Sequence, residues 1–172
     1  MLMPFIRKVR SLCRQPLFVL AWLIPVWLLL GVAKVLILTV PFKRLCPWFG
    51  DSAGIEPLRP LIDPSQLPLA VRIGSVIRMA ARYSPWTSNC FPHAIVASFL
   101  LGIYRIPYAM YFGLKRDPSA PSLSAHAWVV AGRVDVTGGS SFSRFTVVGR
   151  FLSPLMRGRN AEGSSIERED HG

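Results

Sequence analysis

Long apolar runs and shorter periodic ones alternate along the chain. Residues 17–33 (LFVLAWLIPVWLLLGVA) contain no charged side chain, and the run continues after Lys34 as VLILTVPF to Phe42. It is apolar on every helical face, so it lacks an amphipathic signature. Two interpretations stay open. One is a membrane helix, because about 20 apolar residues span a bilayer; the other is a buried helix or helical hairpin that Pro25 and Gly31 kink or break.

Two helices are predicted after a proline-rich connector. Residues 43–68 hold five prolines and two glycines, a density that forbids a long regular element. Residues 69–83 then place apolar side chains at helical spacing. Residues 84–101 begin as a turn and continue as a helix, because Pro92 suits a first helical turn and Gly102 is a typical helix stop.

The second half of the chain predicts strands. Residues 106–114 are rich in aromatic side chains and indicate a strand, which the polar loop 115–122 follows. Residues 123–137 indicate a β-hairpin that turns near Ala131-Gly132. Residues 142–148 predict a further short strand or helix. The fold class expected from helices followed by strands is α+β.

The expected organisation has four segments. They are a basic N-terminus with an apolar helix or hairpin, the proline-rich connector, the catalytic α+β domain, and a polar tail that we expect to be disordered. In chain order they cover residues 1–42, 43–68, 69–156 and 157–172.

The composition of the chain is apolar and strongly basic. The chain has 172 residues, of which 51% are hydrophobic and 17% charged, and its formal net charge is +11. This composition argues against a disordered chain. The charge favours an acidic partner such as anionic lipid, nucleic acid or an acidic peptide, without choosing among them. We expect no nucleic-acid partner, and no phosphate-binding glycine-rich loop occurs.

The cysteines indicate a compartment. Cys13, Cys46 and Cys90 make a poor disulfide framework, because their number is odd and small. Free thiols fit a reducing environment, so we expect a cytoplasmic protein. No small-residue cleavage site follows the apolar run, so we expect no signal peptide. Membrane contact through residues 17–42 stays open.

Cys90 and His126 are the candidate catalytic residues. Cys90 stands at the start of a predicted helix, where free N–H groups and a partial positive charge stabilise a thiolate, the attacking form of cysteine. His126 stands on a separate predicted strand, from which its imidazole can exchange a proton with the thiol. This order of elements predicts an active site with Cys90 as the nucleophile and His126 as its base.

Asp135 is the candidate that orients the imidazole. Side chains alternate along a strand, so His126 and Trp128 share one face. A two-residue turn at Ala131-Gly132 pairs residue 128 with 135 and residue 126 with 137, which brings Asp135 diagonally close to His126. A three-residue turn would flip this parity and remove Asp135 from the site.

Each of these residues also has a structural interpretation. Cys90 can be a buried small hydrophobe, His126 a hydrogen-bonded structural histidine, and Asp135 a solvated strand residue. His93 follows Cys90 on the same helix and is expected to be supporting or structural. No C-x-x-C or H-x-x-x-H spacing occurs, so we expect no metal and no cofactor.

Several stretches resemble the lasso-peptide leader peptidases, the transglutaminase-like proteases of lasso-peptide biosynthesis. The Cys-led helix and the Ala-His-Ala-Trp motif are the specific parts of the resemblance, which covers roughly residues 17–148. The matching stretches are Pro41–Leu45 before Gly50, Trp86 through Asn89-Cys90, Leu100–Gly102, Ala109–Leu114, Ala125–Val129, Val136–Gly139 and Arg144–Thr146.

The resemblance implies an α+β fold, a papain/transglutaminase-like cysteine protease domain with an N-terminal apolar helical region. It also implies a Cys-His-Asp peptidase that removes the leader from a ribosomally made precursor peptide. Cys90 and His126 carry over directly. The acid of many relatives is expected where this chain has Gly138, which leaves Asp135, Thr137 or a backbone group as the third member. The backbone N–H of Cys90, with the Asn89 side chain, would stabilise the oxyanion, and Trp128 would support the site.

The implied partners are a precursor with its leader, a separate leader-recognition protein and an ATP-dependent macrolactam synthetase. Two other functions stay open. One is transglutaminase-like acyl transfer, in which an amine replaces water. The other is a non-catalytic membrane-associated scaffold in which Cys90 and His126 are structural.

Overall fold

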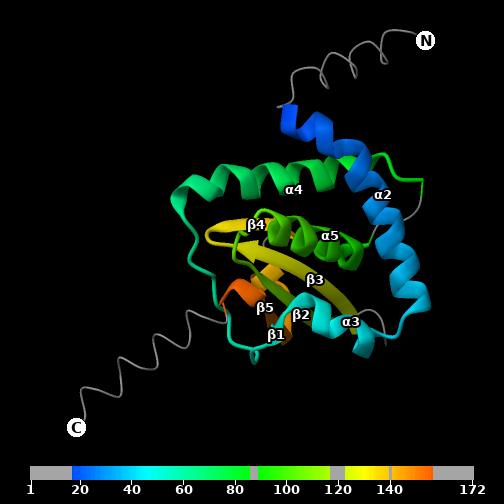
Figure 1. Cartoon of the computed structure of the whole chain (residues 1–172). Coiled ribbons are helices and arrows are strands. Elements are labelled where there is room, and N and C mark those ends of the chain that lie inside the picture. Colours follow the sequence, from blue (N-terminus) through cyan, green and yellow to red (C-terminus); the bar gives the residue numbers. More distant parts are fainter. Residues whose placement is uncertain (1–16, 86–88, 117–122, 140, 157–172) are drawn as a thin grey trace.

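The computed structural model describes residues 17–85, 89–116, 123–139 and 141–156, and the predicted polar tail lies outside them. Helices pack against a single antiparallel sheet, of which only the short first strand precedes the helix Leu67–Arg82, so the α+β expectation is confirmed (Figure 1). The helices are α2 (Leu17–Thr39), α3 (Phe42–Phe49), α4 (Leu67–Arg82) and α5 (Cys90–Ile103), with short 3-10 turns η1 (Pro64–Gln66), η2 (Ser141–Ser143) and η3 (Pro154–Met156). The strands are β1 (Asp51–Ser52), β2 (Ala109–Arg116), β3 (Leu123–Ala131), β4 (Val134–Thr137) and β5 (Thr146–Leu152).

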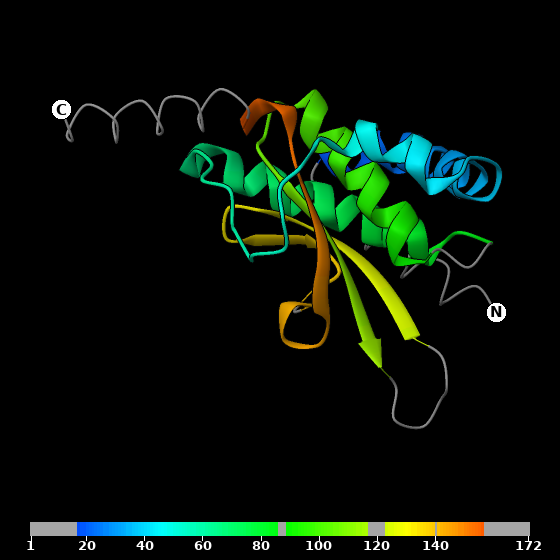
Figure 2. The same ribbon diagram turned by 90° about the horizontal axis from the view of Figure 1, so that it is seen from below.

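The sheet separates two layers of side chains. Its strand order is β1-β5-β2-β3-β4, and every neighbouring pair is antiparallel. The helices gather on one side, and the turn with η2 lies on the other (Figure 2). Alternation along β3 follows this division. Ala127, Val129 and Ala131 belong to the large core under the helices, whereas Trp128 and Val130 belong to a smaller cluster on the opposite face.

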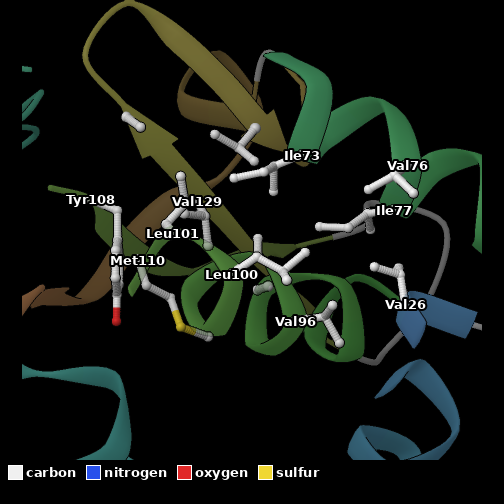
Figure 3. Close-up of a cluster of buried hydrophobic side chains, with 14 of the residues drawn as sticks. Val26, Ile73, Val76, Ile77, Val96, Leu100, Leu101, Tyr108, Met110 and Val129 are labelled. Atoms are coloured by element: carbon white, nitrogen blue, oxygen red, sulfur yellow. The ribbon is translucent and has the colours of Figure 1, made fainter. Parts of the chain in front are cut away.

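Helix α5 lies at the centre of the large core (Figure 3). It is apolar almost all round, which is typical of a helix buried on most sides. Its Leu100 and Leu101 are fully buried with Ile73 and Ile77 of α4 and with Val129 of β3. This burial fixes the position of the helix start, where Cys90 stands.

Helix α2 resolves the two interpretations of the apolar run. It is continuous across Pro25 and Gly31, which excludes a helical hairpin. One face of α2 packs against α4 and α5 and is completely buried, with Val26 and Leu30 at its centre. The other face is exposed. The helix is therefore part of the domain, and it is also long and apolar enough to cross a membrane by length and composition.

The predicted connector begins with a short helix, which its high proline content did not predict. Helix α3 buries Leu45 and Phe49 in the large core. Phe49 belongs to an aromatic cluster in which its ring centroid lies 5.8 Å from that of Phe91 and 6.3 Å from that of Phe112. This aromatic packing stabilises a helix that interior Pro47 would otherwise disfavour.

The remainder of the connector crosses the far face of the sheet. The Tyr111 hydroxyl hydrogen-bonds both the backbone N–H and the carbonyl of Leu58. Arg59 donates to Asp135 at 2.7 Å. The Arg150 guanidinium donates to the carbonyls of Glu56 and Ala53. These bonds tie the segment across the smaller cluster.

The hairpin forms, but its predicted register is wrong. The turn residues are Gly132 and Arg133 rather than Ala131-Gly132, so Asp135 pairs with Val130. A bulge then shifts the ladder, and Thr137 pairs with Val129. The predicted element at 142–148 is mainly a strand, β5, which begins at Thr146 and extends to Leu152.

Leu30 and Leu28 offer a matched test of the packing of α2. Leu30 is fully buried and Leu28 is 55% exposed on the same helix. We expect Leu30→Ala to lower the free energy of unfolding by about 2–5 kcal/mol, because it leaves a cavity in the core. Leu28→Ala should change it by less than about 1 kcal/mol. Denaturant unfolding of both variants checks this. Equal effects would contradict the packing described for α2.

Candidate active site

Cys90 is the first residue of α5. Its Sγ lies 4.0 Å from the carbonyl oxygen of Ala125, the residue before His126 on β3. The thiol is partly exposed. The first N–H groups of a 14-residue helix face this position, and they favour a negative charge there. The predicted helix start and its neighbouring strand are therefore confirmed as structure, and the thiol is both accessible and placed in a positive environment.

His126 lies on the face of β3 that turns away from the helices. Its imidazole stacks on the Phe145 ring, with centroids 4.7 Å apart and planes at 17°. The Trp128 ring lies 6.0 Å away on the same face. Gly113 of β2 is paired with His126, and a Cβ on Gly113 would stand 2.8 Å from both the Trp128 ring and Phe145. The missing side chain therefore leaves room for the aromatic stack around the imidazole.

The Nε2 atom of His126 points at Gly138. A Cβ on Gly138 would stand 3.1 Å from this nitrogen and 2.4 Å from Cβ of Trp128. Nε2 is buried and has no hydrogen-bond partner among the described residues. Gly138 has a φ of +82°, in the left-handed region, and its carbonyl accepts a hydrogen bond from the Ser141 hydroxyl. The backbone of Gly138 therefore occupies the space next to Nε2, where relatives are expected to carry the acid.

Burial lowers the pKa of His126 below its ordinary value of 6.5. The adjacent backbone of Gly138 opposes this shift, and the positive charge of Arg144 adds to it. The imidazole is therefore neutral at pH 7 and can accept a proton, as a general base must. Burial also lowers the pKa of His93, one helical turn after Cys90.

Cys90 lies at the same end of β3 as His126, but no contact joins their side chains among the described residues. The thiol reaches the backbone immediately before His126, while the imidazole ring leans on the opposite face of the strand. No hydrogen bond links Sγ to Nε2, because this nitrogen has no partner in the described part of the chain. The structure therefore brings both residues to one end of β3 without pairing the thiol with the imidazole.

The predicted third member lies elsewhere on the hairpin. Asp135 keeps the parity expected of it, but it pairs with Val130, four residues along β3 from His126. At about 3.3 Å per residue, this is about 13 Å along the strand. Its carboxylate pairs with Arg59 instead. The alternative Thr137 accepts a hydrogen bond from the N–H of Val129. Both placements argue against these residues as the group that orients His126.

The predicted supporting residues are Asn89 and Trp128. Asn89 precedes α5, is exposed, and makes no side-chain capping hydrogen bond, so its amide can face a substrate. Trp128 is completely buried beside His126 and stacks on Tyr111, with ring centroids 5.5 Å apart. Trp86, the first residue of the resemblance before Cys90, lies outside the described residues.

Sequence reasoning missed Phe145 as the ring that holds the imidazole. The stretch Arg144-Phe145-Thr146 was part of the resemblance, but nothing in its pattern places Phe145 against a residue nineteen positions earlier. Within the described ranges, no group of three or more His, Cys, Asp or Glu side chains could hold a metal ion.

Comparison with known proteins agrees with this architecture. The profile of the transglutaminase-like superfamily matches residues 36–150, well over half of the chain. No curated protein and no solved structure matches. Members of this superfamily are typically Cys-His-Asp enzymes. The matched range begins within α2, includes both Cys90 and His126, and ends in β5. From the fold and the match together, the chain belongs to the transglutaminase-like superfamily.

Proposed function

We propose that the protein is a cysteine peptidase that removes the leader from a ribosomally synthesised lasso-peptide precursor in the cytoplasm. The observation that carries the proposal is the placement of Cys90, at the start of a buried helix and next to the strand that bears His126. The superfamily supports peptidase or acyl-transfer chemistry at such a cysteine. The lasso-peptide substrate rests on the resemblance of the Cys-led helix and the Ala125–Val129 stretch.

The proposed reaction follows from the chemistry of these two side chains. The Cys90 sulfur attacks the scissile carbonyl carbon, and His126 takes the thiol proton. The backbone N–H of Cys90 and the Asn89 side chain stabilise the oxyanion. The C–N bond breaks, His126 protonates the leaving amine, and a thioester remains on Cys90. Water then attacks the thioester, His126 accepts its proton, and the thiol and the free carboxylate are released.

In this mechanism packing holds the imidazole, and no carboxylate of the described residues contacts it. Stacking on Phe145 and close packing by Trp128 and Gly138 restrict its rotation. A neutral imidazole suits the base role at pH 7, because burial lowers the pKa of His126. For proton transfer, the imidazole has to leave its position beside Gly138 and turn toward the thiol when substrate binds.

We also propose that a separate protein recognises the leader. The described elements before Cys90 are α2, α3, β1, η1 and α4, and three of them contribute to the core of this domain. A flexible leader costs ordering entropy on binding, and a second binding module offsets this cost by raising the effective concentration of the substrate. The ATP-dependent macrolactam synthetase would act on the freed core peptide.

The variants Cys90→Ala and His126→Ala test the proposed function. Each should lower cleavage of a lasso precursor by at least about 1000-fold, and the double variant should lose little more, because the two residues act as one unit. His93→Ala and Asp135→Asn are the matched controls, and we expect them to retain cleavage within about tenfold. Product masses measured by mass spectrometry follow the reaction and separate hydrolysis from amide exchange.

Full cleavage by Cys90→Ala would exclude the mechanism. A loss with His93→Ala as large as that with His126→Ala would instead make His93 the base. Products that gain an added amine rather than water would favour acyl transfer. Circular dichroism of each variant separates lost chemistry from lost folding.

The lowered pKa of His126 predicts a pH dependence. The folded protein resists protonation of this buried imidazole, so its contribution to stability is complete above pH 6.5 and is lost as the pH falls from 6.5 through the lowered pKa. The acid limb of the cleavage rate that belongs to His126 should also lie below pH 6.5. NMR titration of His126 in Cys90→Ala measures this pKa without a thiolate nearby, and His93→Ala assigns the signals. A midpoint above 6.5 would show that an anionic group stabilises the imidazolium.

The two-component proposal predicts that cleavage depends on a partner. With the leader-recognition protein present, we expect kcat/KM for full-length precursor to rise at least about tenfold. A short peptide that spans only the scissile bond should be cleaved at the same rate with and without the partner. Equal rates on full-length precursor would contradict a separate recognition protein and leave the peptidase mechanism standing.

A further inference from the structure

The outward face of α2 is a continuous apolar surface. Its exposed side chains recur every three or four residues, on the side of the helix opposite to the buried Val26 and Leu30. Every exposed residue of α2 before Thr39 is apolar. The large members of this surface, which we name the α2 stripe, are Leu17, Ile24, Leu28, Val32, Val35 and Leu38.

The packing of α2 decides how it can meet a membrane. At about 1.5 Å per residue, its 23 residues would be about 35 Å long, enough to span a bilayer. A spanning helix, however, would have to leave α4 and α5, which cover its buried face. The Trp22 indole N–H also donates to the Tyr104 hydroxyl at 2.8 Å, which ties α2 to the end of α5. The stripe is therefore available to lipid only if the whole domain lies on the surface.

Charge around the stripe has one sign. The first 50 residues contain no Asp or Glu, and their basic residues are Arg7, Lys8, Arg10, Arg14, Lys34, Lys43 and Arg44. Lys43 and Arg44 are exposed on α3, directly after α2. Trp48 and Phe42 are exposed on the same short helix, at 71% and 45%. Exposed aromatic and basic residues beside an apolar helix face are typical of segments that lie in the membrane interface.

We propose that the α2 stripe docks this domain in the plane of an anionic membrane surface, with α2 lying in the interface rather than crossing it. Lipid suits the stripe better than a protein partner does. The stripe offers no hydrogen-bonding side chain before Thr39, whereas protein interfaces carry about one hydrogen bond per 100–200 Å². The exposed Lys43 and Arg44, which directly follow α2, suit anionic headgroups. This inference does not depend on the chemistry of Cys90.

Sedimentation with lipid vesicles tests the proposal on the full chain. We expect the protein to pellet with vesicles that contain phosphatidylglycerol, more weakly with pure phosphatidylcholine, and more weakly at high salt. Leu28→Glu should lower the partition coefficient by at least about tenfold, because it places a charge in the stripe. Ile55→Glu is the matched control, since Ile55 is 59% exposed outside the helices, and it should bind as the unchanged protein does.

Three results would overturn the inference. The first is absence of binding to anionic vesicles, or equal binding by the Leu28→Glu protein. The second is resistance of the bound protein to alkaline carbonate, which would show that α2 spans the bilayer. The third is a dimer in vesicle-free solution that Leu28→Glu dissociates, which would assign the stripe to a second copy of the chain. Circular dichroism confirms that both variants fold.

Discussion

The burial of α5 is the constraint on which the rest of the structure depends. This helix has no polar face that could be exposed to water, so it is stable only when other elements cover it. Helices α2 and α4 cover it on one side, and β3 covers it on the other. A helix enclosed in this way cannot slide along its axis, because each side chain fills a fitted space. The position of Cys90 beside Ala125 is therefore a consequence of packing far from the thiol.

Packing against neighbouring groups holds the imidazole ring of His126 in the described structure. A carboxylate would hold the imidazole by a directional hydrogen bond and stabilise its protonated form. Here a stacked phenyl ring and a close glycine backbone hold it, while Nε2 faces Gly138 without a hydrogen bond among the described residues. Such packing fixes the plane of the ring but leaves its proton affinity low. Burial therefore keeps the pKa of His126 below its ordinary value.

Much of this architecture could be predicted from the sequence because its signals are local. The start of α5 at Cys90 followed from a single apolar run with Pro92 in its first turn. The hairpin followed from alternation, but its register depended on which two residues form the turn. That choice moved Asp135 two positions along β3 and placed it beside Arg59. The ion pair of Asp135 with Arg59 and the stacking of Phe145 on His126 could not be predicted, because each contact joins segments that are distant in the chain.

The place of β5 in the sheet has a consequence for synthesis of the protein on the ribosome. Asp51 pairs with Leu152, and β5 lies between β1 and β2, so the sheet cannot close until the chain has been made to its last strand. Until then the apolar helices have no complete surface to cover. Contacts of such sequence separation form slowly and leave hydrophobic segments exposed to aggregation. A nascent chain with this order of elements would therefore rely on chaperones, or on early adsorption of its apolar segments to lipid, before the domain is complete.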